Sequence, residues 1–182
     1  MRAWLLFGLG ALVLFSTGAA VLYFKKPKGR KAADAFYGPL HPGVQYTEAD
    51  KGRVNLSPEW KAANLVPVVL HTGQTVLLHK KIAAEFPKLF AQACTASGHT
   101  PKSVQTFMAR HTNWNPAENL SYHTYGVAVD FDPTLNGKNK PAGASELDKH
   151  PEFVRIFERA GWSWGGRWKS ESLDPMHFQA VV

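Results

Sequence analysis

Apolar positions alternate or cluster in the way that β-strands require at several places along the chain. Residues 64–70 and 75–78 are apolar runs on either side of a His-Thr-Gly-Gln sequence, which predicts a β-hairpin. Residues 126–131 predict a buried strand, residues 104–107 a short strand, and residues 177–182 a closing strand. Strands of this length, with turn residues between them, indicate a small sheet.

Two other stretches repeat their apolar side chains at helical spacing. Residues 79–97 predict a helix that ends at Gly98, and residues 151–160 predict a helix that ends at Gly161. Pro87 lies inside the first of these patterns, so a kink or a restart of the helix is expected there. Helices and a small sheet together predict an α+β fold.

The chain begins with an uncharged apolar run over residues 3–24. A run of roughly 20 apolar residues can cross a bilayer as a helix, so one N-terminal transmembrane helix is expected. A cleaved signal peptide is the alternative, because Arg2 precedes the run and residues 16–20 are small. The apolar residues 21–24 that follow favour an uncleaved anchor.

A cluster of five basic residues follows this run, and by the positive-inside rule it would keep the rest of the chain in the cytoplasm. The members of this basic cluster are Lys25, Lys26, Lys28, Arg30 and Lys31. Residues 25–59 are rich in Pro and Gly and show no sustained periodicity. We therefore expect an anchor with its juxtamembrane charges over residues 1–31, a tether over 32–59 that becomes ordered near its end, and a domain over 60–182.

Composition narrows the function classes only slightly. The net charge of +7 is compatible with nucleic acid, an anionic membrane or an anionic polymer, but no nucleic-acid-binding motif is present. Six tryptophans are many for this length, and four of them come late in the chain. Cys94 is the only cysteine, so the chain can form no internal disulfide, and its apolar surroundings indicate a buried side chain.

Candidate chemistry is concentrated in two segments, residues 121–130 and 174–178. They supply His123, Asp130 and His177, and two imidazoles with one carboxylate are the ligands of a hydrolytic zinc site with an open fourth position. Zinc lowers the pKa of a bound water to about 7 and polarises a carbonyl. Asp174 is a candidate general base, and Arg110 is a candidate donor to an oxyanion.

Each of these residues also has a plain structural interpretation. Asp174 precedes a proline and could start a turn, Arg110 could be a solvated charge, and the tryptophans could be core residues. The joint occurrence of all of them, in one order, favours the catalytic interpretation.

That order resembles a known family of peptidases. The matching residues are Ser121-x-His123-x-x-Gly126-x-Ala128-x-Asp130, Trp164-Gly-Gly-x-Trp168 and Asp174-x-x-His177-Phe178. They are similar to the zinc D-Ala-D-Ala carboxypeptidase and L-Ala-D-Glu endopeptidase family, which includes vancomycin-resistance carboxypeptidases and several phage endolysins. A weaker similarity extends over residues 60–182.

The resemblance implies a compact fold shared with the hedgehog signalling domain, with a small antiparallel sheet flanked by helices. It implies that His123, Asp130 and His177 bind Zn²⁺, that Asp174 is the catalytic base, and that Arg110 stabilises the oxyanion. It also places Ser121, Trp164 and Trp168 in substrate binding or around the ligands. The chain departs from the family pattern at His111 after the arginine, at Asp174 where glutamate also occurs, and at Gln179 in place of glutamate.

The sequence therefore predicts a monomeric, membrane-anchored zinc peptidase that acts on peptidoglycan stem peptides, either as an L-Ala-D-Glu endopeptidase or as a D-Ala-D-Ala carboxypeptidase. The Trp-Gly-Gly element resembles the endopeptidases more. Such a substrate requires the domain outside the cytoplasm, against the positive-inside rule, as in the exported signal-arrest segments of some phage lysins. The alternatives are a cytoplasmic peptidase acting on recycled wall peptides and a non-catalytic zinc-containing module that binds the cell wall.

Overall fold

The computed structural model describes residues 24–138, 140–141 and 143–182. The predicted transmembrane run lies outside these residues, apart from Phe24. Within the described part of the chain, no helix is both long enough and apolar enough to cross a bilayer. The described residues form an α+β fold, as the hydrophobic pattern predicted, and their strands make three small antiparallel sheets.

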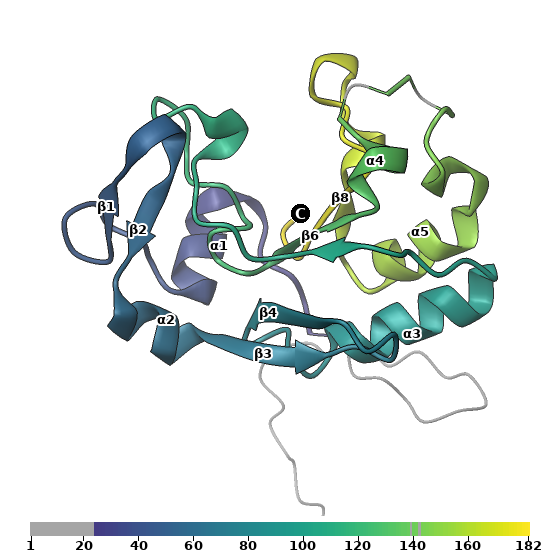
Figure 1. The fold of residues 1–182 in the computed structure, drawn as a ribbon, viewed down its shortest axis with the longest axis horizontal. Helices are drawn as coiled ribbons and strands as arrows, with labels where there is room; N and C mark the ends of the chain where they lie inside the picture. Colours follow the sequence, from purple (N-terminus) through teal and green to yellow (C-terminus); the bar gives the residue numbers. More distant parts are fainter. Residues whose placement is uncertain (1–23, 139, 142) are drawn as a thin grey trace, which may run out of the picture.

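The central sheet has four antiparallel strands in the order β5-β6-β8-β7. The strands are β5 (Val104–Gln105), β6 (Ala128–Phe131), β7 (Ser163–Trp164) and β8 (His177–Gln179). Strand β6 lies between β5 and β8 in the middle of the molecule (Figure 1). The buried strand predicted over residues 126–131 and the closing strand from residue 177 are thus neighbours.

The predicted hairpin is confirmed as β3 (Leu65–Val69) and β4 (Thr75–His79), paired over their full length. It packs against the turn before β6, where His79 N–H donates to the Gly126 carbonyl at 2.9 Å. A Cβ on Gly126 would lie 2.7 Å from the Leu65 side chain and 2.9 Å from His79 N. This close approach, together with a positive φ of 69°, explains why the motif has glycine here.

Helices α3 (Phe86–Ser97) and α5 (Pro151–Arg159) pack together on one side of the central sheet (Figure 1). Helix α3 starts later than the periodicity predicted, because the chain turns over residues 80–84 and Pro87 lies in the first turn. Proline is tolerated there since the first helical N–H groups need no partner. The helix ends at Gly98, which is left-handed with φ 66°, as predicted. The buried core between the helices and the sheet includes a cluster of phenylalanines, Phe86, Phe90, Phe131, Phe153, Phe157 and Phe178.

The segment before the hairpin carries regular structure from residue 29 onward. It contains α1 (Gly29–Tyr37), β1 (Tyr46–Glu48), β2 (Val54–Leu56) and α2 (Pro58–Asn64). Tyr37 is buried and donates to the Ala180 carbonyl at 2.7 Å, and Gly29 N–H donates to the Val182 carbonyl at 2.7 Å. This segment therefore contributes to the core from its beginning, and not only near residue 59, where order was predicted. The division into anchor, tether and domain remains a prediction.

One member of the basic cluster is buried in the folded domain. Lys26 Nζ lies 2.6 and 2.7 Å from the two carboxylate oxygens of Glu85, and Trp162 Nε1 donates to the same carboxylate at 3.1 Å. Burial lowers the pKa of Lys26, and the charge and hydrogen bonds of Glu85 oppose that shift. This lysine has an internal role, so it does not contribute a free positive charge beside a membrane.

Candidate active site

The three predicted metal ligands converge on one point of the central sheet. Asp130 in β6 and His177 in β8 are directly paired across the two strands, so their side chains lie on the same face. His123 reaches them from the turn that precedes β6. His177 Nδ1 lies 3.0 Å from Asp130 Oδ1, His123 Nε2 lies 3.2 Å from the same oxygen, and the two nitrogens are 3.1 Å apart. All three residues are buried.

This triangle of donor atoms fits a divalent metal ion. Ligand bonds of about 2.1 Å in a tetrahedral site place neighbouring donors roughly 3.3 Å apart, close to the separations here. Burial alone would raise the pKa of Asp130, but hydrogen bonds and charge from His123 and His177 outweigh burial and lower it. The carboxylate is therefore ionised at neutral pH, as a metal ligand must be.

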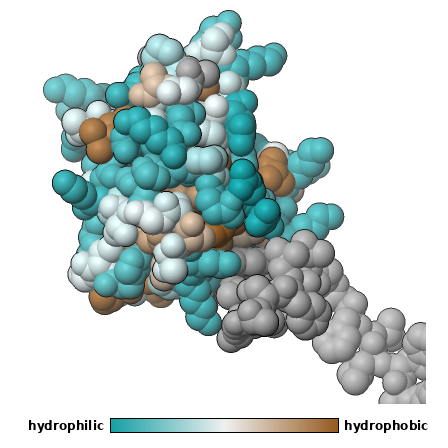
Figure 2. All heavy atoms as spheres, turned by 90° about the vertical axis from the view of Figure 1, so that its right-hand side faces the viewer, coloured by the Kyte–Doolittle hydropathy of each residue, from teal (hydrophilic) through white to brown (hydrophobic). Residues whose placement is uncertain are grey.

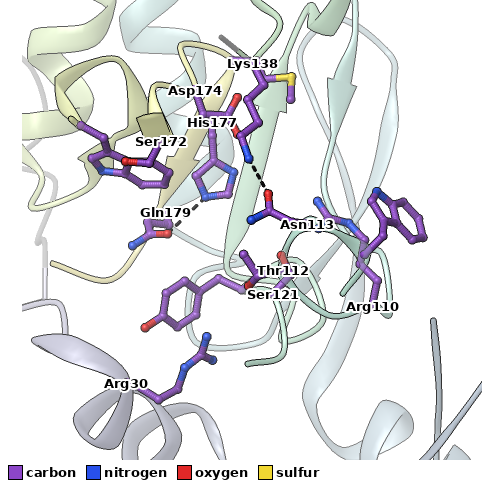
Figure 3. Close-up of a pocket in the computed structure, with 14 residues that line it drawn as sticks. Arg30, Arg110, Thr112, Asn113, Ser121, Lys138, Ser172, Asp174, His177 and Gln179 are labelled. Atoms are coloured by element: carbon purple, nitrogen blue, oxygen red, sulfur yellow. Dashed lines mark hydrogen bonds between the residues drawn. The ribbon is translucent and has the colours of Figure 1, made fainter. Parts of the chain in front are cut away.

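Further hydrogen bonds fix which nitrogen of each imidazole faces the centre. His123 Nδ1 donates to the Thr106 carbonyl, which leaves Nε2 free to act as a ligand. His177 Nε2 donates to Gln179 Oε1 at 3.2 Å, which leaves Nδ1 as the ligand atom, and this contact is drawn in Figure 3. Gln179 is itself oriented, because its Nε2 donates to the Val181 carbonyl at 3.2 Å. Such outer partners set ring orientation and ligand basicity.

The role of Gln179 was missed in the sequence, where it appeared only as a departure from a glutamate in relatives. The sequence feature that could have revealed this role is its position two residues after His177 in a strand, because that spacing puts both side chains on one face. An amide oxygen accepts the imidazole N–H just as a carboxylate does, but it adds no charge to the site.

Asp174 lines the same pocket and is held by the backbone around it. Its N–H donates to the Gly165 carbonyl at 3.1 Å, and its carbonyl accepts from His177 N–H at 3.0 Å. A Cβ on Gly165 would lie 2.3 Å from the Asp174 carbonyl oxygen, so the Trp-Gly-Gly motif needs glycine there. Trp164 is buried beneath this turn and donates to the Pro175 carbonyl at 2.7 Å. It therefore supports the turn and is not among the residues that line the pocket.

The Asp174 carboxylate is placed to exchange a proton. Its Oδ1 is buried and has no hydrogen-bond partner. Burial raises the pKa of Asp174, His177 opposes that shift, and the negative charge of Asp130 adds to it. A carboxylate with a raised pKa and a free acceptor atom has the properties of a general base.

Arg110 lines the pocket from another side, as Figure 3 shows. Its backbone pairs with Arg53 just before β2, and the neighbouring Ala109 carbonyl accepts from Val54 N–H at 3.1 Å. The guanidinium lies 5.0 Å from the Trp114 ring, and its Nε is buried without a hydrogen-bond partner. Burial lowers the pKa of Arg110, while Asp130 and Asp174 oppose that shift. A buried donor without a partner inside a pocket suits a ligand oxygen.

The pocket encloses about 350 Å³, and His177 is the ligand residue that lines it. Ser121 and Trp168, both predicted near the site, line it, and the Trp168 ring lies 5.3 Å from the His177 ring. Ser121 Oγ accepts from His123 N–H at 3.3 Å. Two cations that sequence reasoning did not place here, Arg30 and Lys138, also line the pocket. Arg30 comes from α1, far from the motifs along the chain, and Lys138 comes from the loop after β6, so no local pattern joins the two.

A comparison with known families matches one segment in the second half of the chain. Residues 115–180 match a family model described as D-alanyl-D-alanine carboxypeptidase. This stretch contains His123, Asp130, Asp174 and His177, so the resemblance on which the sequence analysis relied is confirmed there. Searches of curated proteins and of solved structures found no match. The matched segment is peptidase-like and its site has the donor set of a metallopeptidase.

Proposed function

We propose that the protein is a zinc-dependent hydrolase of peptide bonds in peptidoglycan stem peptides. The observation that carries this proposal is the buried triangle formed by His123, Asp130 and His177. Its member His177 lines a pocket together with Asp174, and the segment that contains all four residues matches a carboxypeptidase family.

In this proposal each residue of the site has one task. His123 Nε2, His177 Nδ1 and Asp130 Oδ1 hold the ion, and Thr106 and Gln179 keep the imidazoles in the required tautomers. A zinc ion held there would supply the positive charge that acidifies water and polarises the scissile carbonyl.

Asp174 then takes the proton from the attacking water at its unpaired Oδ1 and passes it to the leaving amine nitrogen. Arg110 donates to the carbonyl oxygen as negative charge develops on it. Both tasks need buried groups without internal partners, and Asp174 Oδ1 and Arg110 Nε are two of the few such atoms in the described residues.

The charge of the pocket supports an anionic peptide as the substrate. Arg30, Arg110 and Lys138 line it together with one carboxylate residue, Asp174. Peptidoglycan stem peptides carry free carboxylates, and fixed cations in a pocket attract them. Because this substrate lies outside the cytoplasm, we propose an extracytoplasmic location for the domain, held at the membrane through the apolar N-terminal run.

Defined stem peptides test the proposal and identify the bond. The zinc-loaded full-length protein is incubated with a synthetic pentapeptide stem that ends in D-Ala-D-Ala, and the products are separated by mass spectrometry. Free D-Ala indicates carboxypeptidase activity, and a fragment that begins with D-Glu indicates endopeptidase activity. The matched control is Asp174→Asn, which keeps the size of the side chain and removes the base.

Either product, if absent with Asp174→Asn and after chelation, supports the proposal. An intact peptide in the presence of protein whose site of His123, Asp130 and His177 holds zinc would refute it and would favour a non-catalytic binding module.

A further inference from the structure

A second group of potential metal ligands lies away from the pocket, where α3 ends and α5 begins. It consists of His99, just after α3, and of Glu146 and His150, which flank the 3₁₀-helix η3 (Leu147–Lys149) before α5. One donor atom from each residue lies within 4.8 Å of the other two. Within the described part of the chain, this group and the triad are the two that meet this criterion.

The fold holds His99 in place on its side of the cluster. Gly98 turns the chain out of α3 in a left-handed conformation, and Ser97 Oγ accepts from His99 N–H at 3.2 Å. The imidazole packs edge-on against Phe153 of α5, with ring centroids 6.1 Å apart. It also stacks on His150 with ring centroids 4.1 Å apart and an angle of 14° between the planes. The two imidazoles are therefore held next to each other. Because a metal ion lies in the plane of an imidazole that binds it, one ring must turn out of this stack before both can bind one ion.

Glu146 and His150 are fixed by the short helix between them. Leu147 is fully buried and its N–H donates to Asn136 Oδ1 at 2.9 Å, which anchors η3 to the core. Glu146 Oε1 lies 3.4 Å from His150 Nε2, while Lys149 binds the other oxygen, Oε2, at 2.7 Å. A metal ion could take Oε1 without displacing this lysine.

His99 Nε2 is the least satisfied atom of the group. It is buried and has no hydrogen-bond partner in the protein, although a buried ring nitrogen normally finds one. Burial lowers the pKa of His99, the nearby His150 lowers it further, and Asp132 and Glu146 oppose the shift. Neutral imidazoles are the form that binds metal ions.

We propose that His99, Glu146 and His150 form a second site for a divalent transition-metal ion of the zinc type. Two imidazole nitrogens and one carboxylate oxygen suit Zn²⁺, Ni²⁺ or Co²⁺ and do not suit Ca²⁺ or Mg²⁺, which prefer oxygen ligands. Donors at most 4.8 Å apart must approach to the roughly 3.3 Å of a tetrahedral site, and one imidazole must rotate out of the stack as they do so.

Such a site would cross-link the end of α3 to the start of α5, which pack against each other. None of its three residues lines the pocket, so its task is to stabilise the fold and it is independent of the proposed hydrolysis. It faces the side of the molecule on which α3 ends, a mostly hydrophilic surface (Figures 1 and 2), so an ion can enter from solvent.

Zinc stoichiometry separates this site from the first. Full-length protein is stripped with chelator, incubated with excess Zn²⁺ alone, passed over a desalting column, and its metal content is measured by inductively coupled plasma mass spectrometry. We expect two zinc ions in the wild type and one in His99→Ala. Glu146→Gln, which leaves both imidazoles in place, should also bind one. His71→Ala is the matched control, because His71 is exposed and belongs to neither group, and it should retain two.

Thermal unfolding provides the second measurement. In the His177→Ala background, where the first site lacks a ligand, Zn²⁺ should raise the midpoint of unfolding, and adding His99→Ala should abolish that increase. One zinc ion in the wild type that persists in His99→Ala, or two zinc ions in both proteins, would overturn the second site. A wild type with one ion that is lost in His99→Ala would retain the second site and refute the first.

Discussion

Replacing Lys26 by methionine removes the positive charge from a buried ion pair and leaves the chain length of the side chain nearly unchanged. Both partners are almost fully buried, with side-chain exposures of 0% for Lys26 and 5% for Glu85. After the substitution, Glu85 keeps a single hydrogen bond, from the Trp162 indole at 3.1 Å. The carboxylate must then remain buried and charged with little compensation, or take up a proton.

The expected loss of unfolding free energy follows from these two options. Breaking a buried pair by removing one partner costs about 3–5 kcal/mol of unfolding free energy. Protonating a glutamate of ordinary pKa at pH 7 costs roughly 2.7 × 1.36, or about 3.7 kcal/mol, and this limits the electrostatic loss. We therefore expect Lys26→Met to destabilise the protein by about 3 kcal/mol at pH 7. With a urea slope of about 2 kcal/mol/M, the midpoint of unfolding should fall by roughly 1.5 M.

The loss should depend on pH in a defined direction. In Lys26→Met the cost comes from a buried negative charge that has lost its partner. The difference from wild type is therefore full at pH 7 and shrinks as the pH falls toward about 4.3, where carboxylates take up protons. Adding Glu85→Gln should recover most of the stability at pH 7, because the buried charge is gone.

Urea unfolding of the full-length proteins, followed by tryptophan fluorescence at pH 7 and pH 4.5, measures these differences. Lys25→Met is the matched control, because Lys25 is the exposed neighbour in the basic cluster and its loss should change stability by less than about 0.5 kcal/mol. Equal effects of the two lysine substitutions, or a Lys26→Met loss that does not change with pH, would refute the reasoning.

Three further predictions concern the hairpin and the pocket. Burial lowers the pKa of His79 to about 4, although its hydrogen bond to the Tyr37 carbonyl opposes this shift. The unfolding free energy of the wild type, measured by urea titration, should therefore drop by about 3 kcal/mol as the pH falls from 6.5 to 4. His79→Gln should lose this pH dependence, and an unchanged pH dependence would show that His79 is not its source. Gln179→Leu should weaken zinc binding by about 10–100-fold in competition with a chromophoric chelator, whereas Gln179→Glu keeps the acceptor oxygen and should not. Equal zinc affinities of Gln179→Leu and the wild type would show that Gln179 does not support His177. Gly165→Ala should displace the turn that carries Asp174 and lower the hydrolysis rate by about 100-fold or more. The circular dichroism spectrum should be unchanged, and full activity would show that the turn tolerates a Cβ.

The sequence allowed prediction of the elements whose signals are local. The hairpin of β3 and β4, helix α5 and the stop at Gly98 each follow from periodicity and turn residues within a few positions. The grouping of His123, Asp130 and His177 was also predicted, from their residue types and from the resemblance. The structure explains it, because β6 and β8 pair and place Asp130 opposite His177. The α+β class followed from these elements together.

Features that depend on tertiary contacts could not be predicted. Helix α1 lies in a Pro- and Gly-rich stretch, and its burial depends on Tyr37 contacting the C-terminal segment. Lys26 looks like any other member of the basic cluster until Glu85, 59 residues later, is placed beside it. The pairing of His99 with His150 depends on how α3 packs against α5, and no spacing in the sequence encodes that contact.

The central claim is that the pocket hydrolyses a peptidoglycan peptide with the metal ligands and base assigned to it. The most direct test digests purified muropeptides with the zinc-loaded full-length protein and with Asp174→Asn matched for zinc content, and it compares the products by mass spectrometry. We predict new products of defined mass for the wild type, their loss on chelation, their return when Zn²⁺ is added back, and none for Asp174→Asn. Intact muropeptides from a wild type that holds its zinc, or equal cleavage by Asp174→Asn, would contradict the account.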